Sequence, residues 1–188
     1  APLAKLVSGN SSKVLAHIWR FTTSSIEAVE IDDIKVTSSG TALDDISKVY
    51  LYADRNGSGA KVTPFEIASG NQGTAATTYY VTDGKTLIPA DSYVLVYVYV
   101  DTSMVDGTSV ANGDTIKFDL ADVSADVNVT GKSSGQQFDP AGTDDRVSAA
   151  HQLYKTYPTV TVAPTSPSGN LVIGSLQKVA IFRITADA

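Results

Sequence analysis

An acidic loop carries the clearest metal-binding pattern in the sequence. The stretch Asp54-x-Asn56-x-Ser58-Gly59 has oxygen-bearing side chains at alternate positions, followed by glycine. Calcium loops use this spacing because alternate side chains wrap one cation while glycine permits the sharp turn. The second half of such a loop is missing, since Phe65 stands where a calcium loop ends in glutamate. Asp54, Asn56 and Ser58 are therefore candidate ligands for calcium, the one cofactor the sequence suggests, and a plain Asn-Gly hairpin is the alternative.

Other acidic and histidine side chains offer weaker metal chemistry. Carboxylates gather in two further stretches, Glu27, Glu30, Asp32 and Asp33 in the first and Asp139, Asp144 and Asp145 in the second. Hard oxygen ligands suit calcium better than zinc or copper, and solvated surface charge is the alternative for both groups. His17 and His151 are the only histidines, and with no cysteine they make no ordinary zinc site. We interpret His17, which alternates with Leu15 and Trp19, as a structural residue.

No stretch of the sequence carries the pattern of a catalytic site. There is no G-x-S-x-G nucleophile elbow, no phosphate-binding loop and no dinucleotide fingerprint. The absence of cysteine excludes a thiol nucleophile and disulfide bonds. We therefore predict that the protein is not an enzyme.

Short strands separated by turn residues must position these side chains. The candidate calcium loop lies between the expected strands 49–53 and 61–67, and a phase slip at Asp32-Asp33 predicts a β-bulge within 27–36. The stretch 92–101 is apolar on both faces, which favours the centre of a sheet. Helical periodicity is almost absent. The sequence thus predicts an all-β fold, a sandwich of the immunoglobulin-like or jelly-roll kind.

One sequence pattern occurs twice, near the two ends of the chain. Lys13-Val-Leu-Ala-His-Ile-Trp-Arg-Phe-Thr22 resembles Lys178-Val-Ala-Ile-Phe-Arg-Ile-Thr185, and Leu-Val-x-Gly precedes both copies in step. Aligning the two requires dropping two residues from the second copy, as a β-bulge could allow. Both faces of 14–22 are largely apolar, which predicts an inner strand. The repeat predicts that the chain begins one module and ends having begun another, and chance similarity between two β-rich strands is the alternative.

A change in composition marks the expected domain boundary. Residues 163–169 contain two prolines and a glycine, which is typical of a linker. We expect a β-sandwich domain over residues 1–162, a linker over 163–169, and a terminal strand segment over 170–188. That last segment is either the start of a repeat module or a donor strand. It extends beyond the main domain and is too short to fold alone.

Charge and composition narrow the partners and the location. The net charge of −6 argues against nucleic acid and anionic membranes, because both need a cationic face. The longest apolar run, 94–100, is too short to cross a bilayer as a helix. The opening Ala1-Pro2 suggests a mature or excised protein. Sequons at Asn10, Asn56 and Asn128 would permit glycosylation.

The order of these patterns resembles the Ig-like β-sandwich modules of large bacterial or archaeal cell-surface proteins. The resemblance covers roughly residues 1–162 and rests on five stretches: 13–22, 27–36, Val49-Tyr-Leu-Tyr52, Ile88-Pro89 and Gly113-Asp-Thr-Ile-Lys-Phe118. It implies an extracellular structural role in an S-layer, a stalk, or a pilus-like filament. Its expected partners are copies of itself or adjacent modules of a longer chain.

Two assembly routes follow from the repeated pattern. In a tandem array, residues 170–188 open the next module. In donor-strand complementation, they add to a neighbour's sheet and polymerise the protein. The residues expected to form that polymerisation strand are Leu171, Val172, Val179, Ile181, Phe182 and Ile184.

A binding module is the alternative of a different class. Calcium at the acidic loop would suit a calcium-dependent adhesin. Tyrosines in the expected strands would suit a carbohydrate-binding face, although packing between strands explains them equally well. These tyrosines are Tyr50, Tyr52, Tyr79, Tyr80, Tyr93, Tyr97 and Tyr99.

Overall fold

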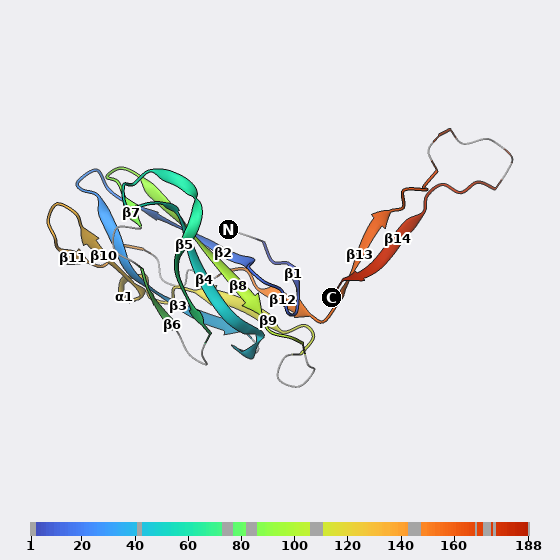
Figure 1. Ribbon diagram of the computed structural model, residues 1–188, viewed down its shortest axis with the longest axis horizontal. Coiled ribbons are helices and arrows are strands. Elements are labelled where there is room, and N and C mark those ends of the chain that lie inside the picture. Colours follow the sequence, from blue (N-terminus) through green and yellow to red (C-terminus); the bar gives the residue numbers. More distant parts are fainter. Residues whose placement is uncertain are drawn as a thin grey trace.

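Two β-sheets face each other across an apolar core, and a separate two-stranded ribbon follows them along the chain (Figure 1). This is a computed structural model that describes residues 3–40, 43–72, 77–81, 86–105, 111–142, 148–167, 169, 170, 174 and 176–187. The predicted all-β sandwich is confirmed.

The smaller sheet of the sandwich contains four antiparallel strands in the order β2-β8-β4-β5. Their bounds are β2 Val14–Thr22, β4 Ile46–Arg55, β5 Lys61–Asn71 and β8 Tyr93–Thr102. β8 pairs with β2 on one side and β4 on the other, so the central position predicted for it is confirmed. Its valines at alternate positions are buried, because the second sheet covers that face.

The larger sheet is built around the long strand β3, Val29–Gly40. Along β3, the strands β10 and β9 pair with successive stretches, as do β7 and β6. At the far edge β1 joins β12 in parallel. The bounds are β1 Leu6–Ser8, β6 Thr77–Tyr80, β7 Leu87–Ile88, β9 Thr115–Asp119, β10 Val127–Gly131, β11 Gln137–Phe138 and β12 His151–Tyr154.

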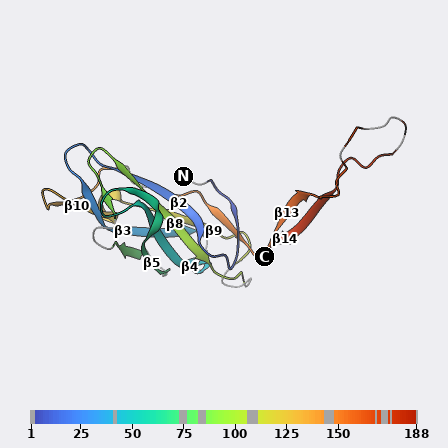
Figure 2. The ribbon, with the colours of Figure 1, turned by 45° about the horizontal axis from the view of Figure 1, so that its top comes forward.

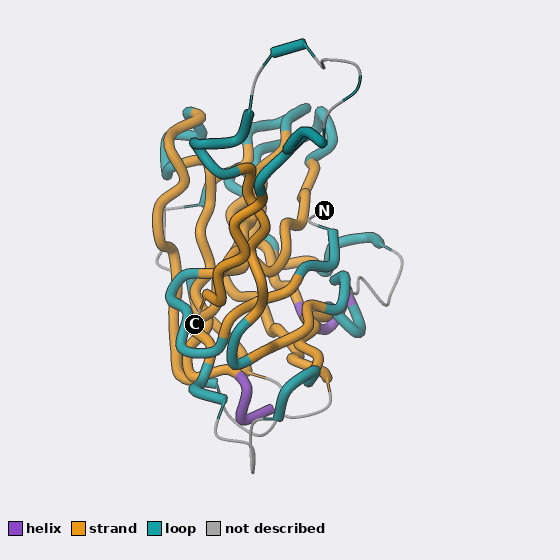
Figure 3. Tube along the Cα trace, turned by 90° about the vertical axis from the view of Figure 1, so that its right-hand side faces the viewer, coloured by secondary structure: helices purple, strands orange, loops and turns teal. Residues whose placement is uncertain are grey.

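Helix is limited to two short turns in the described part of the chain, η1 Leu43–Asp45 and α1 Val123–Asp126 (Figure 3). α1 forms because the Asp122 carboxylate accepts hydrogen bonds from Ser124 N and Ala125 N and caps a helical turn. Extended structure resumes at Val127.

The bulge predicted in β3 is confirmed. Asn128 and Val129 of β10 lie opposite Asp33 and Ile31, so Asp32 is the extra residue. Its carboxylate accepts a hydrogen bond of 2.6 Å from the Thr130 hydroxyl. The bulge restores the phase in which Ile31 and Ile34 both enter the core.

β2 is an edge strand, not the inner strand that its sequence predicts. Within the described residues it pairs with β8 alone. A register shift between Leu15 and His17 adds one residue to β2, which partly accounts for the length difference between the two copies of the repeated pattern. The outer face of β2 is covered by side-chain packing. Long side chains pack against tyrosines on this face, where the Arg20 guanidinium lies 4.2 Å from the Tyr93 ring centre.

The terminal ribbon consists of β13, Tyr157–Val162, and β14, Phe182–Asp187. These strands pair with each other, antiparallel, and with no other strand among the described residues. Figures 1 and 2 both show the ribbon extending away from the sandwich. The expected linker 163–169 follows β13 within this ribbon, and the division into domains stays a prediction.

Candidate functional site

The loop at Asp54 forms the turn of the β4–β5 hairpin, as the alternative interpretation of the sequence predicts. The Asp54 side chain is buried, and its Oδ1 accepts a hydrogen bond of 2.8 Å from Leu95 N. Asn56 Oδ1 accepts from both the backbone N (3.1 Å) and the hydroxyl (2.6 Å) of Ser58. Gly59 has a φ of 79°, which glycine adopts without strain. The chain itself thus engages oxygens of all three candidate ligands, and calcium binding stays a prediction.

The carboxylates around the β3 bulge are bound by β10 and the turn after it. Glu27 accepts hydrogen bonds from Ser133 N and Ser134 N, and Glu30 forms an ion pair with Lys132. These bonds lower the pKa of Glu27, with the contact from Ser134 as the largest cause. Asp144 and Asp145 lie outside the described residues. No group of three or more His, Cys, Asp or Glu side chains in the described part of the chain is placed to hold a metal ion.

The side chains of His17, His151 and Asp45 are buried inside the sandwich. Burial is the main cause that lowers the pKa of His17 to about 4, and the nearby His151 adds to it. His151 Nε2 donates to the Ala16 carbonyl at 2.8 Å, which fixes its ring against β2. Burial, followed by the charges of Asp114 and Asp44, raises the pKa of Asp45 to about 6. Both histidines are structural side chains of the core, as interpreted from the sequence for His17.

The outer face of the smaller sheet carries a cluster of tyrosines. The rings of Tyr52 and Tyr99 meet edge to face at 5.1 Å, and those of Tyr97 and Tyr99 stack at 6.5 Å. Packing between neighbouring strands therefore accounts for much of their surface. Tyr52, Tyr97 and Tyr99 are nevertheless only half-buried, so part of this tyrosine face meets solvent.

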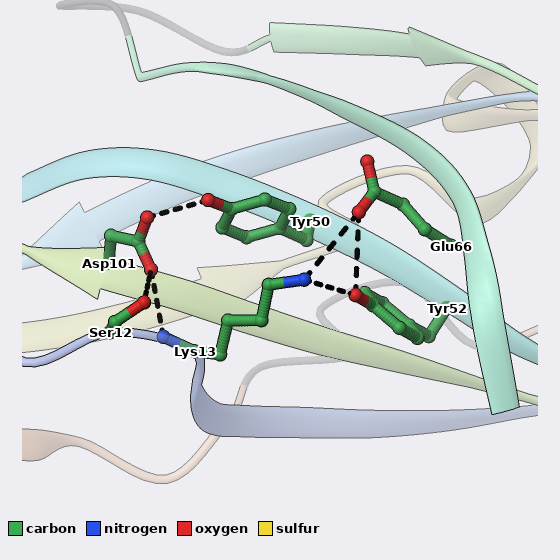
Figure 4. Close-up of polar contacts among 6 residues, drawn as sticks. All are labelled: Ser12, Lys13, Tyr50, Tyr52, Glu66 and Asp101. Carbon is green, nitrogen blue, oxygen red and sulfur yellow. Dashed lines mark hydrogen bonds and ion pairs between the residues drawn. The ribbon is translucent and has the colours of Figure 1, made fainter.

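Lys13 links the tyrosine face to the start of β2 (Figure 4). Its ammonium group donates to the Tyr52 hydroxyl, which raises the lysine pKa, and lies 3.7 Å from Glu66. Its backbone N donates to Asp101 Oδ1 at 2.8 Å, and Tyr50 donates to the other oxygen at 2.6 Å. Although burial opposes the change, these bonds lower the pKa of Asp101. The backbone of Lys13 has a φ of 49°, which is uncommon for a residue other than glycine.

One face of the terminal ribbon is entirely apolar. Val162 lies opposite Phe182, and Val160 lies opposite Ile184. These four side chains point the same way because pairs directly opposite each other share a face. They are 63%, 61%, 59% and 70% exposed, in that order, so nothing in the described structure covers them. The apolar face also includes the opposed pair Pro158 and Ala186.

The predicted polymerisation residues are divided between strand and loop. Phe182 and Ile184 lie in β14, and Ile181 directly precedes it. Val179 is exposed in the segment before β14. Leu171 and Val172 lie outside the described residues. The sequence did not indicate that β13 would be the partner of this strand.

A groove runs along the edge of β2 that β8 leaves free, and no pattern in the sequence indicated it. Two adjoining hollows of about 490 Å³ and 570 Å³ share Phe21, Thr22, Pro140 and Ala141. Residues 17–24 form one wall, and the segment 139–142 forms the other. Apolar side chains of the larger sheet and of the segment 120–123 line the groove beneath these walls. They are Val29, Ile88, Leu120, Val123 and Val129. The edge position of β2 creates this groove, so only the sheet order reveals it.

The three sequons occupy different settings. Asn10 is exposed with a φ of 59°, whereas Asn56 lies in the β4–β5 turn with its Oδ1 bound by Ser58. Asn128 lies in β10, and its Nδ2 donates to Asp33 Oδ1 at 2.8 Å. Asn10 is therefore the most accessible acceptor, and glycosylation stays a prediction.

Comparison with known proteins gave no match to a protein-family model, a curated protein or a solved structure. Among the described residues, no helix is long and apolar enough to cross a membrane. The assignment of function therefore rests on the geometry above.

Proposed function

We propose that this protein is a structural subunit or module of an extracellular assembly, such as a pilus-like filament or S-layer, built by donor-strand addition. The observation that carries the proposal is the exposed apolar face of the β13–β14 ribbon. A two-stranded ribbon is at best marginally stable in water and needs a packing partner. Exposed apolar strands are also an aggregation hazard unless they have a dedicated site.

A second copy is the simplest partner for the ribbon. The ribbon follows β12 directly, so each copy presents one ribbon and one sandwich. Head-to-tail contact between these two unlike surfaces generates an open chain of subunits rather than a closed dimer. The resemblance to Ig-like modules of bacterial and archaeal surface proteins supports an extracellular location for that chain.

The test compares the full chain with two double variants of β13. Val160→Ser with Val162→Ser removes the apolar side chains of this strand, and Thr159→Ser with Thr161→Ser alters its opposite face as a matched control. Light scattering and negative-stain microscopy over a concentration series should show assembly for the parent and the control, and monomers for the first variant. A parent that stays monomeric throughout, or a first variant that assembles equally well, contradicts the proposal.

The tyrosine face favours a carbohydrate-binding module as the second candidate. Tyr52, Tyr97 and Tyr99 form a partly exposed aromatic surface of the kind that packs against sugar rings. A glycan array with the parent and Tyr97→Ala would test it, with Tyr79→Phe in the core as the control. Equal signal from all three proteins, or none, removes this candidate. Calorimetry with calcium, using Asp54→Ala, tests the calcium-dependent form in the same way.

A further inference from the structure

We propose that the groove along the free edge of β2 accepts strand β13 of a second copy, antiparallel to β2. The register places Val162 opposite Trp19, Val160 opposite Phe21, and Tyr157 opposite Ser24. This inference rests on the proposed function and specifies which surfaces meet. In the resulting contact β13 exchanges its present partner, β14, for β2 of the second copy.

The pairing of β14 with β13 is an example, within the same chain, of the pairing proposed between β2 and β13. β14 repeats the sequence of β2, with Ile181-Phe-Arg-Ile-Thr185 matching Ile18-Trp-Arg-Phe-Thr22. β14 pairs with β13, with Phe182 opposite Val162 and Ile184 opposite Val160. A strand of the β13 type is therefore a suitable neighbour for a strand of the β2 type, and the repeat fixes the register.

The directions of the backbone N–H and C=O groups show that β13 pairs with the edge of β14 that corresponds to the free edge of β2. Thr23 N donates to Ser92 O, and in antiparallel pairing every second residue faces the same neighbour. Thr23, Phe21 and Trp19 thus turn their backbone toward β8, whereas Ile18, Arg20 and Thr22 turn theirs toward the groove.

The same reasoning applies to the ribbon. Ala163 N donates to Ile181 O at 2.8 Å, so Ile181, Arg183 and Thr185 turn their backbone toward β13. These residues are the repeats of Ile18, Arg20 and Thr22, which face the groove in β2. β13 therefore lies on the edge of β14 that corresponds to the free edge of β2.

The groove and the apolar face of β13 match in position and chemistry. The proposed register extends over Trp19–Ser24, and both hollows of the groove border this part of β2. Trp19 and Phe21 point toward the larger sheet, so Val162 and Val160 beside them would cover Leu120, Val123 and Val129. β13 carries no charged residue, so it would place no charge over the apolar side chains at the floor of the groove.

The exchange costs β14 little. Backbone hydrogen bonds to β2 replace those that β13 makes to β14, whereas the valines of β13 leave water. Phe182 and Ile184 are already largely exposed in the ribbon, so the loss of β13 changes their surroundings only slightly.

Chain geometry prevents the same copy from filling its own groove. Tyr154 O accepts from Gly9 N, and Asn10 N donates to Ser103 O, so β12 ends beside the Thr102 end of β8. Ser24 lies at the opposite end, about 30 Å away along the nine steps of β8. Tyr157 follows Tyr154 by three residues, which span about 11 Å at most. β13 must therefore come from another copy.

Cysteine cross-linking tests the register, because the natural chain contains no cysteine. The proposal puts Arg20 of one copy directly opposite Thr161 of another on the outer face. Opposed antiparallel residues have Cα atoms about 5.5 Å apart, within the range of a disulfide. Full-length Arg20→Cys and Thr161→Cys proteins are mixed under assembly conditions and mildly oxidised. The matched control replaces Arg20→Cys by Thr63→Cys on β5, the opposite edge of the same sheet.

The expected result is a disulfide-linked heterodimer several-fold more abundant with Arg20→Cys than with Thr63→Cys. Adding Val160→Glu to the Thr161→Cys protein should abolish it, whereas Thr159→Glu, which points outward, should not. If the proteins assemble but cross-link equally at both edges, or only as Thr161→Cys homodimers, the pairing is wrong while the proposed function survives. If no assembly forms, both are overturned.

Discussion

β2 and β14 share one sequence pattern, yet Trp19 of β2 is 6% exposed and Phe182 of β14 is 61% exposed. The intrinsic preference for extended structure is the same, since both segments are strands. What differs is the second layer, because β2 lies against the larger sheet and β14 against nothing in the described structure. The sequence of a strand thus determines which side chains alternate between its two faces. The second layer that packs against the strand determines how far those side chains are buried and how much they stabilise the fold.

The largest expected difference is between truncations of the two aromatic residues. Trp19→Ala should lower the free energy of unfolding of the sandwich by about 3–5 kcal/mol, because it leaves a cavity in a packed core. Phe182→Ala should change it by less than about 0.5 kcal/mol, as for an exposed surface side chain. Urea unfolding of both variants measures this, and equal effects would mean that the ribbon folds against the sandwich.

A smaller difference should come from His17, a residue that β14 lacks. Its pKa of about 4 in the folded protein lies below the unfolded value, so the unfolded chain binds its proton first as pH falls. The stability that neutral His17 permits is complete above about pH 6.5 and is lost between about pH 6.5 and 4. Unfolding of the parent relative to His17→Gln across this range should show a loss of about 1–3 kcal/mol. Parallel pH profiles would contradict it.

Ionisation of Asp45 should change the stability of the sandwich with pH in the opposite direction to His17, over nearly the same pH range. Its raised pKa of about 6 means that the folded protein holds the proton more tightly than the unfolded chain. Asp45→Asn should therefore stabilise the sandwich above pH 6 by about 1–3 kcal/mol, with the gain fading as pH falls toward about 4. Asp139→Asn, at an exposed position away from Asp45, is the control. A gain that is constant with pH would exclude titration of Asp45 as its cause.

The smallest effect should distinguish the two arginines of the repeated pattern. Arg20 stacks over the Tyr93 ring at 4.2 Å, whereas Arg183 has no aromatic ring beneath it among the contacts of the described ribbon. Arg20→Ala should cost the sandwich about 0.5–1 kcal/mol, the range of an exposed cation–π contact. Arg183→Ala should leave its unfolding unchanged. Thermal unfolding of both resolves the difference, and a larger loss from Arg183→Ala would reverse the comparison.

Local patterns predicted much of the sandwich from sequence. Alternation placed β8 at the centre of its sheet, and the phase slip at Asp32 located the bulge, because both features depend on side chains a few residues apart. The sequence of β2 predicted an inner strand, which is wrong. An edge strand whose outer face is covered by Arg20 and the tyrosines shows the same pattern on both faces as a strand in the centre of a sheet. The helical turn at Val123 depends on one capping carboxylate, which alternation conceals.

The candidate site was less predictable, because its parts are joined by pairing across long stretches of chain. The sequence identified β14 through its likeness to β2, but nothing local to Thr159 or Val160 indicated that this strand would pair with it. The groove depends on which strand ends the smaller sheet, a property of sheet order rather than of residue type. The loop at Asp54 shows a different limit, because the same spacing of residues predicts both a cation site and a hairpin turn.

The parallel pairing of β1 with β12 has a mechanical consequence for any filament made of such modules. Leu6, Val7 and Ser8 lie beside Gln152, Leu153 and Tyr154, and the two strands run the same way. Tension applied before β1 and after β12 would pull these neighbours along each other in opposite directions. All the hydrogen bonds between them would then bear load together instead of opening one at a time, so the module would resist stretching by shear.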